Sequence, residues 1–154
     1  MKTNYAVIPF IALLLALVKS LITDQGTLWY ESVLLPARTP SGLFLWIASS
    51  LAFIAFVLSA VLTWNNFKGE RRTILMFVFG ACGALDIAGL YLFFISHYLA
   101  AALGVKLILL AAVLALSAVI LRFNRPASYL LLFYGAWVAL SGYLAYLILV
   151  LNAQ

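Results

Sequence analysis

Charged residues are scarce in this chain of 154 residues, where they make up 8% of the sequence, against roughly 25% in a soluble domain. Hydrophobic residues make up 68%, and the mean hydropathy is +1.19. A soluble fold of this size has too much exterior to hide so much apolar surface. The shortage of charge therefore excludes a soluble domain and a disordered chain, and it indicates an integral membrane protein.

Cysteine and histidine are also nearly missing, because the chain holds one of each, Cys82 and His97. One cysteine forms no intrachain disulfide and completes no metal site. No Ser-His-Asp, Cys-His or paired-carboxylate set can be assembled, so we expect no metal, no required cofactor and no conventional hydrolase. For His97 an exposed turn is favoured over a haem ligand. The basic residues form no stripe, which argues against nucleic acid as a partner.

Five apolar runs are long enough to cross a bilayer. They cover residues 5–22, 42–64, 73–96, 99–121 and 126–151. The sequence thus predicts an all-α integral membrane protein in which residues 1–154 form one domain, a bundle of five transmembrane helices. Residues 23–41, which contain Pro36 and Pro40, are expected to form one long loop between the first two helices.

The basic residues at the ends of these runs predict the orientation in the membrane. One side of the bilayer is expected to receive Lys2, Lys68, Arg71, Arg72, Arg122 and Arg125. The other side is expected to receive Lys19 and Arg38. Because the more basic side normally faces inward, we expect the N-terminus inside and the C-terminus outside.

Two charges fall within the predicted spans. Asp86 and Lys106 lie on consecutive antiparallel spans, both roughly 11–14 Å from the same membrane face at 1.5 Å per helical residue. Intramembrane charges usually face the interior of a bundle and form pairs. We expect an Asp86–Lys106 ion pair; the alternative is a Lys106 that reaches to the interface and a protonated Asp86.

The last span carries an aromatic face with polar tips. Tyr134, Trp137, Ser141 and Leu144 recur at i, i+3, i+7 and i+10, which is one face of a helix. Trp137 is close to mid-depth, deeper than the aromatic belt where Trp64 fits. Such a face suits a macrocycle or a sterol ring system, and plain core packing explains it equally well.

A ridge of small residues runs along the third span. Gly80, Ala84 and Ala88 recur at i, i+4 and i+8, about 200° around the helix from Asp86. Helices associate in lipid where small residues let their backbones approach. We predict a homodimer through this ridge; packing against another span of the same chain is the alternative.

Several segments resemble one known family in order and spacing. Residues 29–40 (WYESVLLPARTP) resemble the first loop of the TspO/MBR family, the tryptophan-rich sensory and translocator proteins, also called peripheral-type benzodiazepine receptor-like. Residues 44–46 (FLW), 84–94 (ALDIAGLYLFF) and 133–138 (FYGAWV) resemble later family motifs, and the chain ends near Leu151-Asn152 as many members do. Asp86 replaces a family asparagine and Gly89 a tryptophan, so the chain resembles a divergent member.

The resemblance implies a membrane-embedded binding protein for hydrophobic ligands of tetrapyrrole (porphyrin or haem) or sterol type. It also implies a role in sensing, transport or slow light-dependent porphyrin degradation, in which Trp46 and Trp137 would take part, and a dimer through the third span. The expected ligand-binding residues are Trp29, Tyr30, Pro36, Trp46, Asp86, Phe93, Phe94, Tyr134, Trp137 and Ser141. Two alternatives stay open: a structural subunit that has lost its ligand, and a proton-linked carrier that uses Asp86 and Lys106.

Overall fold

The structure is a computed structural model that describes residues 4–152, with side-chain surroundings from residue 7 onward. Within this range the chain forms five α-helices and no strand. They are α1 (Asn4–Ser32), α2 (Gly42–Asn66), α3 (Gly69–Phe94), α4 (Leu99–Leu121) and α5 (Arg125–Asn152). All five are long and apolar enough to cross a membrane, which confirms the predicted fold class.

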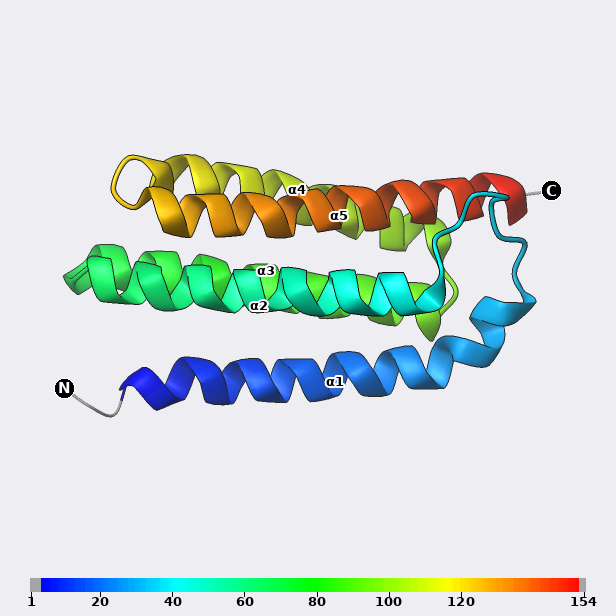
Figure 1. The fold of residues 1–154 in the computed structure, drawn as a ribbon, viewed down its shortest axis with the longest axis horizontal. Helices are drawn as coiled ribbons and strands as arrows, with labels where there is room; N and C mark the ends of the chain where they lie inside the picture. Colours follow the sequence, from blue (N-terminus) through cyan, green and yellow to red (C-terminus); the bar gives the residue numbers. More distant parts are fainter. Residues whose placement is uncertain (1–3, 153–154) are drawn as a thin grey trace.

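The predicted long loop between the first two helices is wrong. Helix α1 continues to Ser32, so the connection to α2 is 9 residues long instead of spanning residues 23–41. Residues 23–32 contain no proline, and the hydroxyls of Thr23 and Thr27 donate to carbonyls one turn earlier, at 2.9 and 3.0 Å. Polar side chains that bond to their own helix backbone are compatible with a helix and often bend it. The last turns of α1 do turn out of line with the rest of the helix (Figure 1).

Helices α2–α5 form a packed four-helix body, and α1 lies along its outside. Figure 1 shows α4 beside α5, then α2 and α3, then α1 as a separate outer layer. The buried apolar cluster comes from residues 52–138, and of the α1 side chains described from residue 7 onward only the partly buried Ile8 packs against it. Leu109, Ile120, Leu131 and Tyr134 are the bulkiest fully buried side chains. The core therefore belongs to α2–α5.

Buried hydroxyls connect three helices of this body near the α4–α5 turn. The Ser117 and Ser128 hydroxyl oxygens are 2.7 Å apart, and Ser128 also donates to the Ser117 carbonyl at 3.0 Å. Ser59 of α2 donates to the carbonyl of Ala127 at 2.7 Å. Hydrogen bonds between helices satisfy polar groups that lipid would leave without partners.

Candidate functional site

Three charged side chains from three helices meet inside the bundle. The Lys106 ammonium lies 3.1 Å from Oδ1 of Asp86, which confirms the predicted ion pair. The Lys19 ammonium lies 2.7 Å from Oδ2 of the same carboxylate. The side chains of Lys19, Asp86 and Lys106 are 17%, 7% and 10% exposed. We call this group the Lys–Asp–Lys triad; it joins α1 to α3 and α4.

The third member of the triad was missed by the sequence reasoning. The orientation argument predicted Lys19 at the end of the first span, and this placement is wrong because α1 continues to Ser32. Lys19 therefore lies well inside the helix, where its ammonium nitrogen also sits 4.7 Å from the centre of the Phe53 ring of α2. The absence of proline from residues 23–32 was the available signal that the first helix could continue past Ile22.

Two glycines make room for the aliphatic part of Lys106. A Cβ atom added at Gly89 of α3 would lie 3.6 Å from Cε of Lys106, and one at Gly142 of α5 would lie 3.7 Å from its Cβ. Gly89 stands where the resembling family motif has tryptophan. The lysine stem thus lies against the position from which that larger side chain would project.

Four of the expected ligand residues form an aromatic cluster with His97. The Trp29 ring stacks on the His97 ring with centroids 4.3 Å apart, and it meets Phe93 edge-on at 5.5 Å. Tyr30 lies 6.3 Å from Phe93 and 6.0 Å from Phe94. Distances of this size are those of interacting aromatic pairs. The cluster fastens the end of α1 to the end of α3.

His97 occupies the exposed turn between α3 and α4, as predicted. Its φ is 59°, in the left-handed region that few side chains adopt. Its Nε2 lies 3.1 Å from the Phe94 carbonyl oxygen. The turn thereby holds the imidazole ring against Trp29, and His97 is part of the aromatic cluster.

The face of α5 predicted for ligand binding is mostly turned into the body. Tyr134 is 1% exposed, and its ring centre lies 4.7 Å from that of Phe56. Trp137 is partly buried and packs against the same core. Ser141 donates its hydroxyl to the Val138 carbonyl at 3.0 Å. The structure therefore shows core packing for Tyr134 and Trp137.

Trp46 is not brought together with the other aromatic residues of the expected site. Its side chain is 67% exposed near the start of α2. Pro36 lies in the connection before it, where its carbonyl accepts from both the N–H and the hydroxyl of Thr39. In the isolated chain Trp46 faces outward, toward lipid or a second protein.

The short connection between α1 and α2 is tied to the end of α5, which the sequence reasoning did not foresee. The Asn152 side chain accepts from the N–H of Leu34 at 3.2 Å and donates to its carbonyl at 3.1 Å. The Leu151-Asn152 ending noted in the sequence was the available signal. Asn152 thus ties the 33–41 connection to α5, at the end of the bundle that also carries the aromatic cluster.

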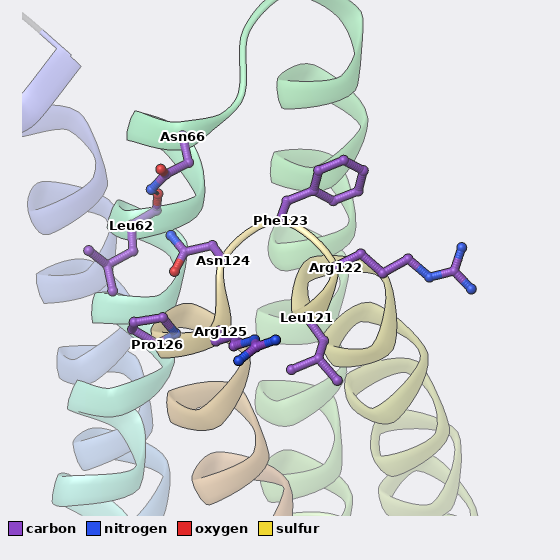
Figure 2. Close-up of a pocket in the computed structure, with 8 residues that line it drawn as sticks. All are labelled: Leu62, Asn66, Leu121, Arg122, Phe123, Asn124, Arg125 and Pro126. Carbon is purple, nitrogen blue, oxygen red and sulfur yellow. Dashed lines mark hydrogen bonds between the residues drawn. The ribbon is translucent and has the colours of Figure 1, made fainter.

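A hollow of about 580 Å³ lies at the opposite end of the bundle. Figure 2 shows its lining residues around the α4–α5 turn, with the Arg122 side chain extending away from the others. These residues are Leu62, Asn66, Leu121, Arg122, Phe123, Asn124, Arg125 and Pro126. None of them belongs to the set expected to bind ligand, so the hollow and the expected site are separate.

These features define an integral membrane protein of five helices, with a charge cluster inside the bundle and an aromatic cluster at one end. The profile of the TspO/MBR family matches residues 7–151, and the chain belongs to that family. It is also 31% identical over 125 residues to the uncharacterized membrane protein YtaB of Bacillus subtilis (strain 168), a match that covers 80% of each chain.

Proposed function

We propose that this protein binds a hydrophobic ligand of tetrapyrrole or sterol type within the membrane and acts in its sensing, transport or slow light-dependent degradation. Family membership supports a membrane ligand-binding or sensory role. The observation that carries the finer proposal is the juxtaposition of the aromatic cluster with the Lys–Asp–Lys triad. Phe93 follows Asp86 by seven residues on α3, which is about 10 Å of helix. An apolar, aromatic site with a few polar groups suits a ligand of this kind.

Tryptophan fluorescence tests the proposal directly. Purified protein in lipid nanodiscs is titrated with protoporphyrin IX, and quenching at micromolar concentration is expected because the porphyrin accepts the excitation of nearby indoles. A Trp46→Phe/Trp137→Phe double variant should bind the porphyrin more weakly and lose any light-dependent loss of porphyrin. Trp64→Phe is the matched control, because Trp64 lies near the other end of α2, where Arg72 stacks on its ring at 4.3 Å. Affinity and porphyrin loss that stay unchanged in the double variant would place the site elsewhere.

A structural or assembly role without ligand is the second candidate. The exposed position of Trp46 and the mutual packing of Trp29, Tyr30, Phe93 and Phe94 favour it. The same titration separates the two candidates, because this role is expected to give no saturable quenching with either a porphyrin or a sterol analogue. The proton-linked carrier would instead show ligand-coupled proton uptake that Asp86→Asn abolishes.

The homodimer through α3 remains part of the proposal. Gly80 and Ala84 are exposed in the single chain and Ala88 is partly exposed, whereas Asp86 on the other side of α3 is buried. Single cysteines at Ala84 and at the half-buried Leu85, in a background without Cys82, test it. Efficient crosslinking at 84 and little at 85 is expected, and the reverse pattern contradicts the dimer.

We also propose that the N-terminus lies inside and the C-terminus outside. The start of α1 and the end of α5 lie at opposite ends of the bundle (Figure 1). Lys68, Arg71, Arg72, Arg122 and Arg125 flank helices at the N-terminal end, while Lys2 lies outside the described residues. With Lys19 inside α1, Arg38 is the one basic residue of the 33–41 connection, which sharpens the charge asymmetry. Labelling of cysteines placed at 38 and 124 by an impermeant reagent tests the orientation.

A further inference from the structure

The charges that meet inside the bundle do not balance. Lys19 and Lys106 bring two ammonium groups to the single carboxylate of Asp86, and these two contacts are the ion pairs found among the described residues. The triad therefore carries a net charge of +1 if all three groups are ionised. An uncompensated charge in the interior of a membrane protein is costly and usually has a partner or a function.

The donors of the two ammonium groups are also in excess. Each ammonium has three N–H bonds. Within the described part of the chain, one N–H of Lys19 goes to Oδ2 of Asp86 and one of Lys106 to Oδ1. The remaining four N–H bonds have no protein acceptor there. The triad is thus prepared for one further acidic group that supplies both the missing charge and new acceptors.

Lys19 is the more exposed of the two lysines of the triad. Lys19 sits on the outer helix α1, its side chain is 17% exposed, and its nitrogen lies over the ring of Phe53 on α2. Helix α1 packs mainly along α3 and touches α2 more sparsely. The Lys19 ammonium thus lies where α1 meets α2, beside an aromatic ring, and keeps some exposed surface.

From these observations we propose that the triad is the recognition site for the carboxylate of an amphipathic organic acid whose apolar body lies among the aromatic and aliphatic side chains of the bundle. Binding adds one negative charge to the net positive triad and leaves two cations facing two anions. This proposal rests on the proposed function and deepens it, because it restricts the ligands to those with an acidic group.

Protoporphyrin IX and its dimethyl ester test this on the wild-type protein. The two compounds share the macrocycle and differ in whether the carboxyl groups ionise. In nanodiscs of neutral phosphatidylcholine, the acid should bind at least about tenfold more tightly than the ester, the effect of one hydrogen bond to a charged group. Equal affinities would overturn the proposal while leaving the proposed function intact. Failure of both compounds to bind would overturn the tetrapyrrole part of the proposed function and this inference with it.

Variants then locate the preference. Lys19→Met and Lys106→Met should each lower the ratio of the affinity for the acid to the affinity for the ester, to a value close to that of a site without charge. Ratios are compared because they cancel the difference in how the two compounds partition into lipid. Lys68→Met is the matched control, because it removes an exposed lysine at the other end of the bundle. A preference for the acid that survives both triad variants, or that Lys68→Met removes equally, shows that general membrane charge is responsible and contradicts the site.

Discussion

Helix α1 and the four-helix body are both apolar enough to cross a membrane, yet they are held in different ways. The central stretches of α2, α3, α4 and α5 are 28–33% buried inside the protein, whereas that of α1 is 0% buried. In lipid, apolar side chains gain little from leaving the solvent, so packing and polar contacts decide where a helix sits. Helix α1 is fastened by local contacts, among them those of Lys19 with Asp86, Gly26 with Phe94, and Trp29 with His97.

Asp86→Asn is expected to have the largest effect, because Asp86 links both regions. The variant leaves two buried ammonium groups without their carboxylate, which destabilises a protein by about 3–5 kcal/mol. Unfolding of the purified variant by a denaturing detergent in mixed micelles measures the loss. Asp24→Asn, at an exposed aspartate of α1, is the control and should change little. A loss below 1 kcal/mol, on the order of a surface pair, would contradict the role of the triad.

The same leucine truncation should give different results in the two regions. Leu109 of α4 is 0% exposed in the core, whereas Leu13 of α1 is 59% exposed. Leu109→Ala should cost about 2 kcal/mol, the low end of the usual range, because lipid replaces water as the reference for the lost side chain. Leu13→Ala should cost less than about 0.5 kcal/mol. Equal losses would show that α1 packs as tightly as the body.

At Gly26 the backbone of α1 packs tightly against Phe94 of α3. A Cβ atom there would lie 2.5 Å from both Cβ and Cδ1 of Phe94, too near for either helix to stay in place. Gly26→Ala should therefore destabilise the α1–α3 contact by about 1–3 kcal/mol, as overpacking does. Gly104→Ala is the control, since nothing lies within 4 Å of its new Cβ, and removing a helical glycine should stabilise by up to about 1 kcal/mol. Crosslinking between cysteines at 23 and 90 monitors the separation of the helices, and unchanged crosslinking in Gly26→Ala counts against the contact.

The smallest effect is expected at the connection between the two regions. Asn152→Ala removes both side-chain hydrogen bonds to Leu34, a local loss of about 1 kcal/mol. The 33–41 connection should then open more often, and tryptic cleavage after the exposed Arg38 should become several-fold faster. Asn66→Ala is the matched control, because the Asn66 amide donates to a carbonyl of its own helix, at 2.7 Å. Cleavage at the wild-type rate in Asn152→Ala would show that the tie does not hold the connection.

Hydropathy was sufficient to predict the number of helices. The equal depth of Asp86 and Lys106 in the membrane was sufficient to predict their ion pair. Both depend on local sequence and on the rise of a helix, which vary little with context. The predicted first helix is too short, because the polar side chains within residues 23–32 favour a loop by composition. Their side chains satisfy the helix backbone itself or pack on α3, which composition does not reveal.

Hydropathy and motifs are thus enough to predict a five-helix membrane bundle of the TspO/MBR family. The contacts of Lys19 with Asp86, the outward direction of Trp46 and the hydrogen bonds of Asn152 to Leu34 become visible in the folded bundle alone. The physical reason is the same in each case. Apolarity places a helix in the membrane, but the rotation of the helix about its axis and its neighbours depend on contacts between residues far apart in the chain, and these exist only in the folded bundle.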